Sequence, residues 1–230
     1  MKTSIPEEGV HLTTLMNSYW NARYANGRIW GDDPCPSALM ANEHFRSANV
    51  KDLLVPGCGY GRNSVFFAEK GYRVTAFDVS DVAIELATAQ ARERSIDIDY
   101  AVGDIFDAAF LTGKEFDGIY LSNVLHLFLA AERDKLVRRL TSLLKRGGIF
   151  AFSCISVFDT NNYGIGPEVE PNTFEKHEGK PLHFFDEIEI RTKLEADYKI
   201  LEQKLHVQTE ADPSGETEDL QLWFVAAQKL

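Results

Sequence analysis

Three glycines in the segment Gly57-Cys58-Gly59-Tyr60-Gly61 are spaced two residues apart and directly follow the apolar run Leu53-Leu54-Val55-Pro56. Glycine adopts positive φ without steric cost and has no Cβ to hold a ligand away from the main chain. The apolar residues that follow, closed by Gly71, predict a helix that starts near Gly61. Because its first amides point back at the turn, the segment predicts a backbone site for an anionic group.

Two acidic residues, Asp78 and Asp104, each follow a run of residues that predicts a strand. Asp78 can accept hydrogen bonds from two vicinal ribose hydroxyls, and Asp104, followed by Ile105-Phe106, suits the edge of an adenine ring. A dinucleotide site spaces its glycines as G-x-G-x-x-G, whereas the spacing here is G-x-G-x-G. Asp78 fits either kind of site, but the glycine spacing and Asp104 favour a ligand with a single adenosine.

The glycine turn and the two acidic residues would be positioned by strands and helices that alternate along the chain. Strands are predicted at 53–55, 72–77, 96–102, 116–122 and 149–153. Helices are predicted before and between them, at about 37–46, 61–71, 80–94 with a Ser80 cap, and 131–144 with Gly147-Gly148 as its stop. Right-handed crossovers make this alternation a doubly wound α/β fold that binds ligands outside the carboxyl ends of its strands.

The chain ends with a predicted helix from about Asp186 and two strands at 200–207 and 220–227, joined by a polar turn at 211–215. Two strands joined by a short turn form an antiparallel hairpin. We therefore expect an α/β fold, with a doubly wound, mostly parallel seven-stranded sheet, helices on both faces and an antiparallel C-terminal hairpin.

The 230 residues carry a formal net charge of -11 and include three cysteines, Cys35, Cys58 and Cys154. Nucleic-acid binding rests on clustered Lys and Arg, so the charge predicts a small-molecule partner and no nucleic acid. The cysteines are too widely spaced for a disulfide framework or a zinc site, which fits a cytoplasmic location and no metal. We also expect no signal peptide over the first 14 residues and no membrane span, because the required apolar runs are missing.

Five short motifs occur in order between residues 50 and 153, namely 55–61, Phe77-Asp78-Val79-Ser80, Gly103-Asp104-Ile105, 116–123 and Lys145-Arg146-Gly147-Gly148. In these motifs the segment resembles the class I S-adenosylmethionine-dependent methyltransferases. The resemblance implies S-adenosyl-L-methionine as the cofactor, with its methionyl part on the glycine turn, its ribose on Asp78 and its adenine on Asp104. The implied cofactor contacts are Gly57, Cys58, Gly59, Asn63, Asp78, Val79, Asp104, Ile105, Ser122 and Asn123.

One position departs from that family, since most members carry an acid two residues before the first glycine and this chain has Val55. The sequence Val-Pro-Gly-Cys-Gly is similar to that of the thiopurine and thiocyanate methyltransferase branch. Trp30-Gly31 and the run over 121–128 are similar to tellurite-resistance methyltransferases. The family also places an antiparallel seventh strand beside the sixth, which the C-terminal hairpin would supply.

Two segments lie outside the regular alternation. The aromatic-rich stretch before the first strand is expected to be a lid, and residues 157–185, with three glycines and three prolines, are expected to be a long functional loop. We expect a single domain over 1–230, with an N-terminal helical arm or lid over 1–49, a cofactor-binding core over 50–153, a substrate-site insertion over 154–185 and a C-terminal helix and hairpin over 186–230.

Methyl transfer from a sulfonium is an in-line displacement, so a general base is needed only for an alcohol or amine acceptor. His126, just past the fourth strand, is the candidate base, unless it merely packs at the start of a helix. Trp30 is expected to close over the cofactor, where an aromatic face attracts a sulfonium, or else to pin the arm to the sheet. The candidate substrate contacts, each with a structural role as the alternative, are Tyr19, Tyr163 and His183.

The leading hypothesis is an enzyme that transfers a methyl group from S-adenosylmethionine to a small-molecule acceptor. A nicotinamide-dependent oxidoreductase is one alternative, against which the third glycine and Asp104 argue. A non-catalytic S-adenosylmethionine-binding module is another, and it would lack space for an acceptor. The fold leaves the acceptor open among thiols, oxyanions of heavy elements, heterocyclic amines and small acids.

Overall fold

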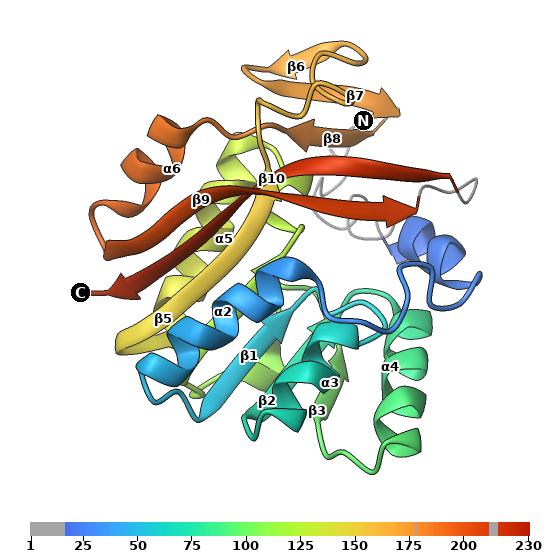
Figure 1. Ribbon diagram of the computed structural model, residues 1–230, viewed down its shortest axis with the longest axis vertical. Coiled ribbons are helices and arrows are strands. Elements are labelled where there is room, and N and C mark those ends of the chain that lie inside the picture. The colour runs from blue at the N-terminus through green and yellow to red at the C-terminus, as the bar shows by residue number, and fades with distance from the viewer. Residues whose placement is uncertain (1–16, 178, 212–215) are drawn as a thin grey trace, which may run out of the picture.

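The computed structural model describes residues 17–177, 179–211 and 216–230. Within them the chain forms a seven-stranded sheet of order β3-β2-β1-β4-β5-β10-β9 and a three-stranded sheet of order β6-β7-β8 (Figure 1). Two predictions fall outside the described residues, namely the absence of a signal peptide over the first 14 residues and the hairpin turn at 212–215.

The large sheet confirms the predicted topology. β1 pairs in parallel with β2 on one side and with β4 on the other. β2 in turn pairs in parallel with β3, and β4 with β5, whereas β10 runs antiparallel to both β5 and β9. The strands are β1 (Asp52–Pro56), β2 (Arg73–Asp78), β3 (Asp99–Val102), β4 (Phe116–Ser122), β5 (Leu144–Ile155), β9 (Tyr198–Ala211) and β10 (Thr217–Lys229). The last two are longer than predicted, and Figure 1 shows them reaching toward the N-terminal helix that is described over 17–24.

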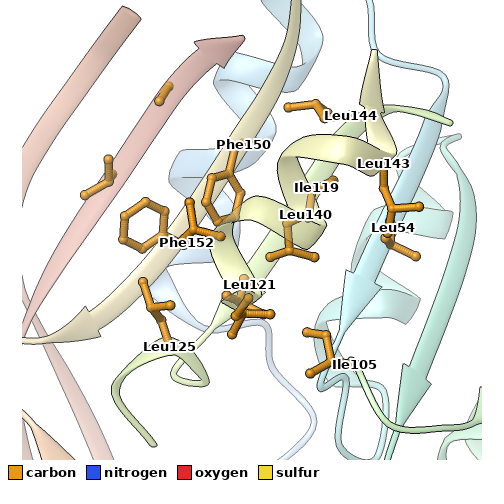
Figure 2. Close-up of a cluster of buried hydrophobic side chains, with 14 of the residues drawn as sticks. Leu54, Ile105, Ile119, Leu121, Leu125, Leu140, Leu143, Leu144, Phe150 and Phe152 are labelled. Carbon is orange, nitrogen blue, oxygen red and sulfur yellow. The ribbon is translucent and has the colours of Figure 1, made fainter. Parts of the chain in front are cut away.

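Helices cover both faces of this sheet, as predicted. On one face, α2 (Pro36–Ser47), α3 (Arg62–Glu69) and α4 (Asp81–Glu93) bury residues such as Phe45 and Phe67 in one apolar cluster with Leu53 and Val55 of β1. On the other face, α5 (Ala130–Leu143) and α6 (Glu187–Leu194) share a second cluster with Leu54. Figure 2 shows Leu140 and Leu143 of α5 in that second cluster, beside strand residues such as Ile119 and Phe150. None of the helices in the described residues is long and apolar enough to cross a membrane.

The end of α5 differs from the prediction. The helix stops at Leu143 and β5 begins at once, so Gly147-Gly148 lies inside a strand instead of ending a helix. Leu144 is fully buried and already pairs with Phe116, after which the register against β4 shifts. Gly147 has a φ of 78°, a value that glycine tolerates at such an irregular point. Burial of Leu144 on the sheet therefore outweighs the glycine signal.

The insertion also differs, because part of the predicted long loop folds as a small antiparallel sheet. Its strands are β6 (Glu168–Glu170), β7 (Thr173–His177) and β8 (Lys180–His183). Thr173 pairs with His183 and Phe174 with Leu182, and Figure 1 shows this sheet beside the C-terminal hairpin. Strands this short carry too few alternating residues for the period of a strand to be recognised in the sequence.

Candidate functional site

A cavity of about 910 Å³ lies at the carboxyl ends of the parallel strands. Its wall includes Gly57 after β1, Asp78 at the end of β2, Ser122 at the end of β4 and Ile155 at the end of β5. Residues of the N-terminal arm and of the β9–β10 hairpin complete the wall. This is the edge at which open α/β sheets bind their ligands.

The glycine turn has left-handed backbone at all three glycines, with φ of 61° at Gly57, 54° at Gly59 and 87° at Gly61. A side chain at Gly57 would place its Cβ 2.6 Å from Cγ2 of Val124, and one at Gly59 would place it 2.7 Å from the Tyr24 hydroxyl. Both the backbone conformation and the lack of space therefore require glycine at these positions.

We expect Gly61→Ala to lower the free energy of unfolding by about 2 kcal/mol. The added Cβ would lie 2.4 Å from the Tyr100 hydroxyl and 2.9 Å from the Cβ of Ala87, in a backbone conformation that already disfavours a side chain. Gly71→Ala is the matched control, because φ is 92° there and nothing lies within 4 Å of the added Cβ. Urea denaturation should show a loss of only about 1 kcal/mol for the control. Equal losses would mean that space beside Gly61 is not limiting.

Asp78 is buried beside the turn and holds it in place. Its Oδ2 accepts a hydrogen bond from the Gly59 amide at 2.8 Å, and its Oδ1 accepts one from the Ser80 amide at 3.0 Å. Burial raises the pKa of Asp78, and these backbone hydrogen bonds oppose the rise. Because each carboxylate oxygen can accept two hydrogen bonds, Asp78 can still accept from hydroxyls of a ligand in the cavity.

Asp104, after β3, borders an apolar slot in the same cavity. Its Oδ1 accepts a hydrogen bond from the Phe106 amide at 2.8 Å. The rings of Phe106 and Phe128 meet edge-on with their centroids 5.3 Å apart, and Ile105 lines the slot with them. An apolar slot with a carboxylate at its edge suits a flat ring that carries an amino group.

Asn123 follows β4 and is fixed by β5. Its φ is 56°, its amide donates to the Ser153 carbonyl at 3.1 Å, and its Oδ1 accepts from the Ser153 hydroxyl at 2.9 Å. The hydroxyls of Ser122 and Ser153 are 3.3 Å apart, and those of Ser37 and Tyr120 are 2.8 Å apart in the core below. This polar network orients the end of β4 toward the cavity.

Aromatic side chains of the N-terminal arm gather over the glycine turn. Trp30 stacks on Tyr60 with their centroids 6.1 Å apart, and Trp20 stacks on Tyr24 at 5.8 Å. The guanidinium of Arg62 lies 5.9 Å from the Trp30 ring centroid and donates to the Trp30 carbonyl at 2.9 Å. All four aromatic residues line the cavity, so the arm forms one of its walls.

His126 lies in the cavity wall with 7% of its surface exposed. The Ile155 amide donates to its Nδ1 at 3.0 Å, so the neutral ring carries its proton on Nε2. Burial, with a smaller contribution from His183, lowers the pKa of His126 to about 3. A neutral ring that presents an Nε2–H group donates a hydrogen bond, and this geometry argues against the predicted role of general base.

The C-terminal hairpin brings two carboxylates to the cavity. Glu210 of β9 and Glu218 of β10 are cross-strand partners, and both line the wall. Glu210 lies 3.5 Å from the Arg62 guanidinium and accepts a hydrogen bond from Asn123 at 3.5 Å. Burial raises the pKa of Glu210, while Arg62 opposes the rise. Glu218 accepts from the amide group of Asn162 at 3.4 Å.

Comparison with known families matches a methyltransferase domain to residues 53–152. The ubiquinone biosynthesis O-methyltransferase of Xanthomonas campestris pv. campestris is 30% identical over 143 residues, which is 62% of this chain and 58% of that protein. The probable S-adenosyl-L-methionine-dependent methyltransferase TehB of Haemophilus influenzae is 30% identical over 115 residues, which is 50% of this chain and 36% of that protein. The chain thus spans less than two thirds of the length of these curated relatives.

Solved structures share the fold of this chain. The 1,6-didemethyltoxoflavin-N1-methyltransferase of Burkholderia thailandensis, with 1,6-didemethyltoxoflavin and S-adenosylhomocysteine bound, superposes with a TM-score of 0.69. The match covers 100% of this chain and 92% of that one at 19% identity. With the domain match and the TehB relative, it confirms the resemblance to class I methyltransferases that the sequence motifs indicate.

The structure brings the predicted cofactor contacts together in one cavity wall. These contacts are Trp30, Gly57, Cys58, Gly59, Asn63, Asp78, Val79, Asp104, Ile105, Ser122 and Asn123. The predicted base His126 lies in the same cavity wall. Val55, which replaces the usual acid, is buried in the apolar cluster under the turn.

Two of the three predicted substrate contacts, Tyr163 in a turn before the small sheet and His183 at the end of β8, do not line the cavity. The Tyr163 hydroxyl donates to Asn172 at 2.8 Å, and its ring packs edge-on against aromatic residues of the insertion. His183 is buried between the Thr173 hydroxyl at 2.8 Å and the Glu189 carboxylate at 2.9 Å. Both residues therefore have structural partners in place of the expected ligand contact.

The third, Tyr19, is also outside the cavity wall. Its ring lies beneath the Lys180 ammonium, 3.5 Å from the centroid, and packs edge-on against Trp20. The neighbouring residues Trp20 and Tyr24, four apart on one helix, line the cavity instead. The aromatic-rich arm was the only signal for them in the sequence, and no signal identified Glu210 or Glu218.

Proposed function

We propose that this methyltransferase binds S-adenosylmethionine in the cavity and transfers its methyl group to a small-molecule acceptor. The observation that carries the proposal is a single cavity whose wall contains the glycine turn, Asp78, Asp104 and Asn123 at neighbouring strand ends. The matched relatives are methyltransferases, and the Burkholderia enzyme was solved with S-adenosylhomocysteine, the demethylated product.

Each part of the cavity has a proposed role toward the cofactor. Asp78 and Val79 receive the ribose, Asp104 and Ile105 the adenine, and the backbone near Asn123 the methionyl ammonium group. Bound S-adenosylmethionine supplies a methyl group on a positively charged sulfur, so the chain has only to align the acceptor and exclude water. Such alignment contributes roughly 7 to 11 kcal/mol to lowering a barrier.

We extend the proposal to the organisation of the chain. The arm over 1–49 and the core over 50–153 together hold the cofactor, and the insertion over 154–185 and the hairpin within 186–230 complete the acceptor side. Trp30 and its aromatic neighbours cover the sulfonium, an interaction worth on the order of 1 kcal/mol. A cytoplasmic location is proposed from the cysteine pattern, and the three thiols are buried and unpaired.

Isothermal titration tests the cofactor directly. S-adenosylmethionine and S-adenosylhomocysteine are expected to bind one site per chain, with NAD giving no heat at the same concentration. Binding of NAD in place of the sulfur compounds would support the oxidoreductase alternative. If neither sulfur compound bound at low-millimolar concentration, the proposed function would be wrong.

A further inference from the structure

The side of the cavity that faces away from the adenine slot is built largely by segments outside the methyltransferase-domain match. We define the acceptor pocket as His126, Ile155, Asn162, Leu182, Glu218 and Leu220, all of which line the cavity. Three of these side chains are apolar, and the other three carry the polar groups. The insertion and the hairpin supply all of them except His126.

His126 contributes a hydrogen-bond donor that has no partner among the described residues. The side chain is more than nine-tenths buried and lines the cavity, and its Nδ1 is occupied by the Ile155 amide at 3.0 Å. Its Nε2–H group has no hydrogen-bond partner among the described residues and is not among the fully buried polar atoms, so it is open to a ligand at the cavity wall. A polar group at the wall of a largely apolar pocket fixes the orientation of a ligand, so a ligand atom with a lone pair is favoured at this point.

The charges around the acceptor pocket are negative. Glu218 faces Glu210 across the hairpin and forms no ion pair with a described residue. Of the cationic side chains in the cavity wall, Arg62 is paired with Glu210 at 3.5 Å and Lys135 lies over the Phe106 ring in the adenine slot. An anionic acceptor would thus meet the Glu218 carboxylate, and none of the six residues of the acceptor pocket is a cation.

We propose that the acceptor is a nitrogen heterocycle, neutral or protonated, that offers a lone pair to His126 and an N–H group to Glu218. This inference rests on the proposed methyl transfer and names the substrate class of the same site. Such a molecule carries a hydrogen-bond acceptor for His126 and a donor for Glu218, and its ring suits the apolar side chains of Ile155 and Leu182 in the same wall. Carboxylates and oxyanions can accept from His126, but Glu218 repels them, so specificity comes from an unfavourable contact as well as a favourable one.

Three probes separate these classes. Benzimidazole has a ring lone pair and a ring N–H, benzoate is flat and anionic, and tellurite is an inorganic oxyanion. Each is titrated by calorimetry into the protein saturated with S-adenosylhomocysteine, whose own binding is measured first. Benzimidazole is expected to bind at least about tenfold more tightly than benzoate, with no heat from tellurite.

The outcomes distinguish the acceptor class from the function itself. Failure of S-adenosylhomocysteine to bind would overturn the proposed methyl transfer. Normal binding of S-adenosylhomocysteine, with benzoate or tellurite bound more tightly than benzimidazole, would overturn the acceptor class alone. The absence of heat from benzimidazole at millimolar concentration would do the same.

Variants test the two polar groups separately. Glu218→Gln is expected to reduce the preference for benzimidazole over benzoate about tenfold, and Glu218→Lys to reverse it. His126→Asn removes the Nε2–H group and should weaken benzimidazole about tenfold without changing the affinity for S-adenosylhomocysteine. Asp219→Asn is the matched control, because this neighbouring carboxylate is exposed and accepts from the Thr209 hydroxyl at 2.6 Å. An unchanged preference in Glu218→Lys would overturn the proposal.

Discussion

Replacing Asp78 by asparagine is expected to weaken S-adenosylmethionine binding by about 3 kcal/mol, which is more than a hundredfold in Kd. The carboxylate accepts the Gly59 amide at 2.8 Å and the Ser80 amide at 3.0 Å, and it is the proposed partner of the ribose hydroxyls. An amide side chain has one accepting oxygen and one donating nitrogen, so it cannot accept from both backbone amides and the ribose as well. Isothermal titration of the variant measures the change.

A control must separate loss of the ligand contact from general destabilisation. Asp117 offers one, since its Oδ2 also accepts from two backbone amides, of Lys51 at 3.0 Å and Asp52 at 2.9 Å. It lies near the start of β4, at the amino ends of the parallel strands, whereas the cavity lies at their carboxyl ends. Asp117→Asn is expected to lower stability but to leave the Kd for S-adenosylmethionine within about twofold. Unchanged affinity in Asp78→Asn would remove Asp78 from the ribose site.

The cofactor side of the cavity could be predicted because its residues follow local patterns. Asp78 comes directly after an apolar strand, and Ser122 ends another, so their positions at strand ends can be read from short stretches of sequence. In a parallel sheet all such ends meet at one edge, and the alternation of strands and helices is enough to infer that arrangement. Residues far apart in the chain were thereby placed together without knowledge of their contacts.

The acceptor side could not be predicted, because it depends on pairing between distant residues. Glu210 faces Glu218 only through the register of a hairpin whose strands are longer than their apolar patterns suggest. Tyr163 and His183 were expected to reach a ligand, but their hydrogen-bond partners are Asn172, between β6 and β7, and Glu189 of α6. Burial and registers of this kind are set by tertiary packing, which overrides local preference.

His126 shows the same limit of prediction from sequence: its position could be predicted, but its role could not. Its position past the fourth strand was predicted correctly, and it does line the cavity. Which of its nitrogens carries the proton depends on the Ile155 amide, 29 residues further along the chain. A sequence shows that a histidine is present, whereas the partner of its second nitrogen decides whether it donates or accepts.

His126→Asn is expected to make the protein more resistant to acid. Between pH 7.5 and 4.5 the free energy of unfolding should fall by about 3 kcal/mol less in the variant than in the wild type. In the folded protein the pKa of His126 is lowered from 6.5 to about 3, so the buried ring takes up no proton over most of this range. The unfolded chain takes one up below about pH 6.5. The unfolded state therefore binds more protons, and wild-type stability is complete above pH 6.5 and falls by about 1.4 kcal/mol per pH unit toward pH 3.

Urea denaturation of both proteins at pH 7.5, 6.0 and 4.5 measures this difference. The Oδ1 atom of asparagine can still accept from the Ile155 amide, so the two proteins should differ by no more than about 1 kcal/mol at pH 7.5. Asp78 and Glu210 titrate in both proteins, and their contributions cancel in the comparison. Below pH 6.5 the wild type should lose stability faster than the variant. If the two curves stayed parallel, His126 would bind a proton as readily in the folded protein as in the unfolded chain, and it would again be a candidate for the general base.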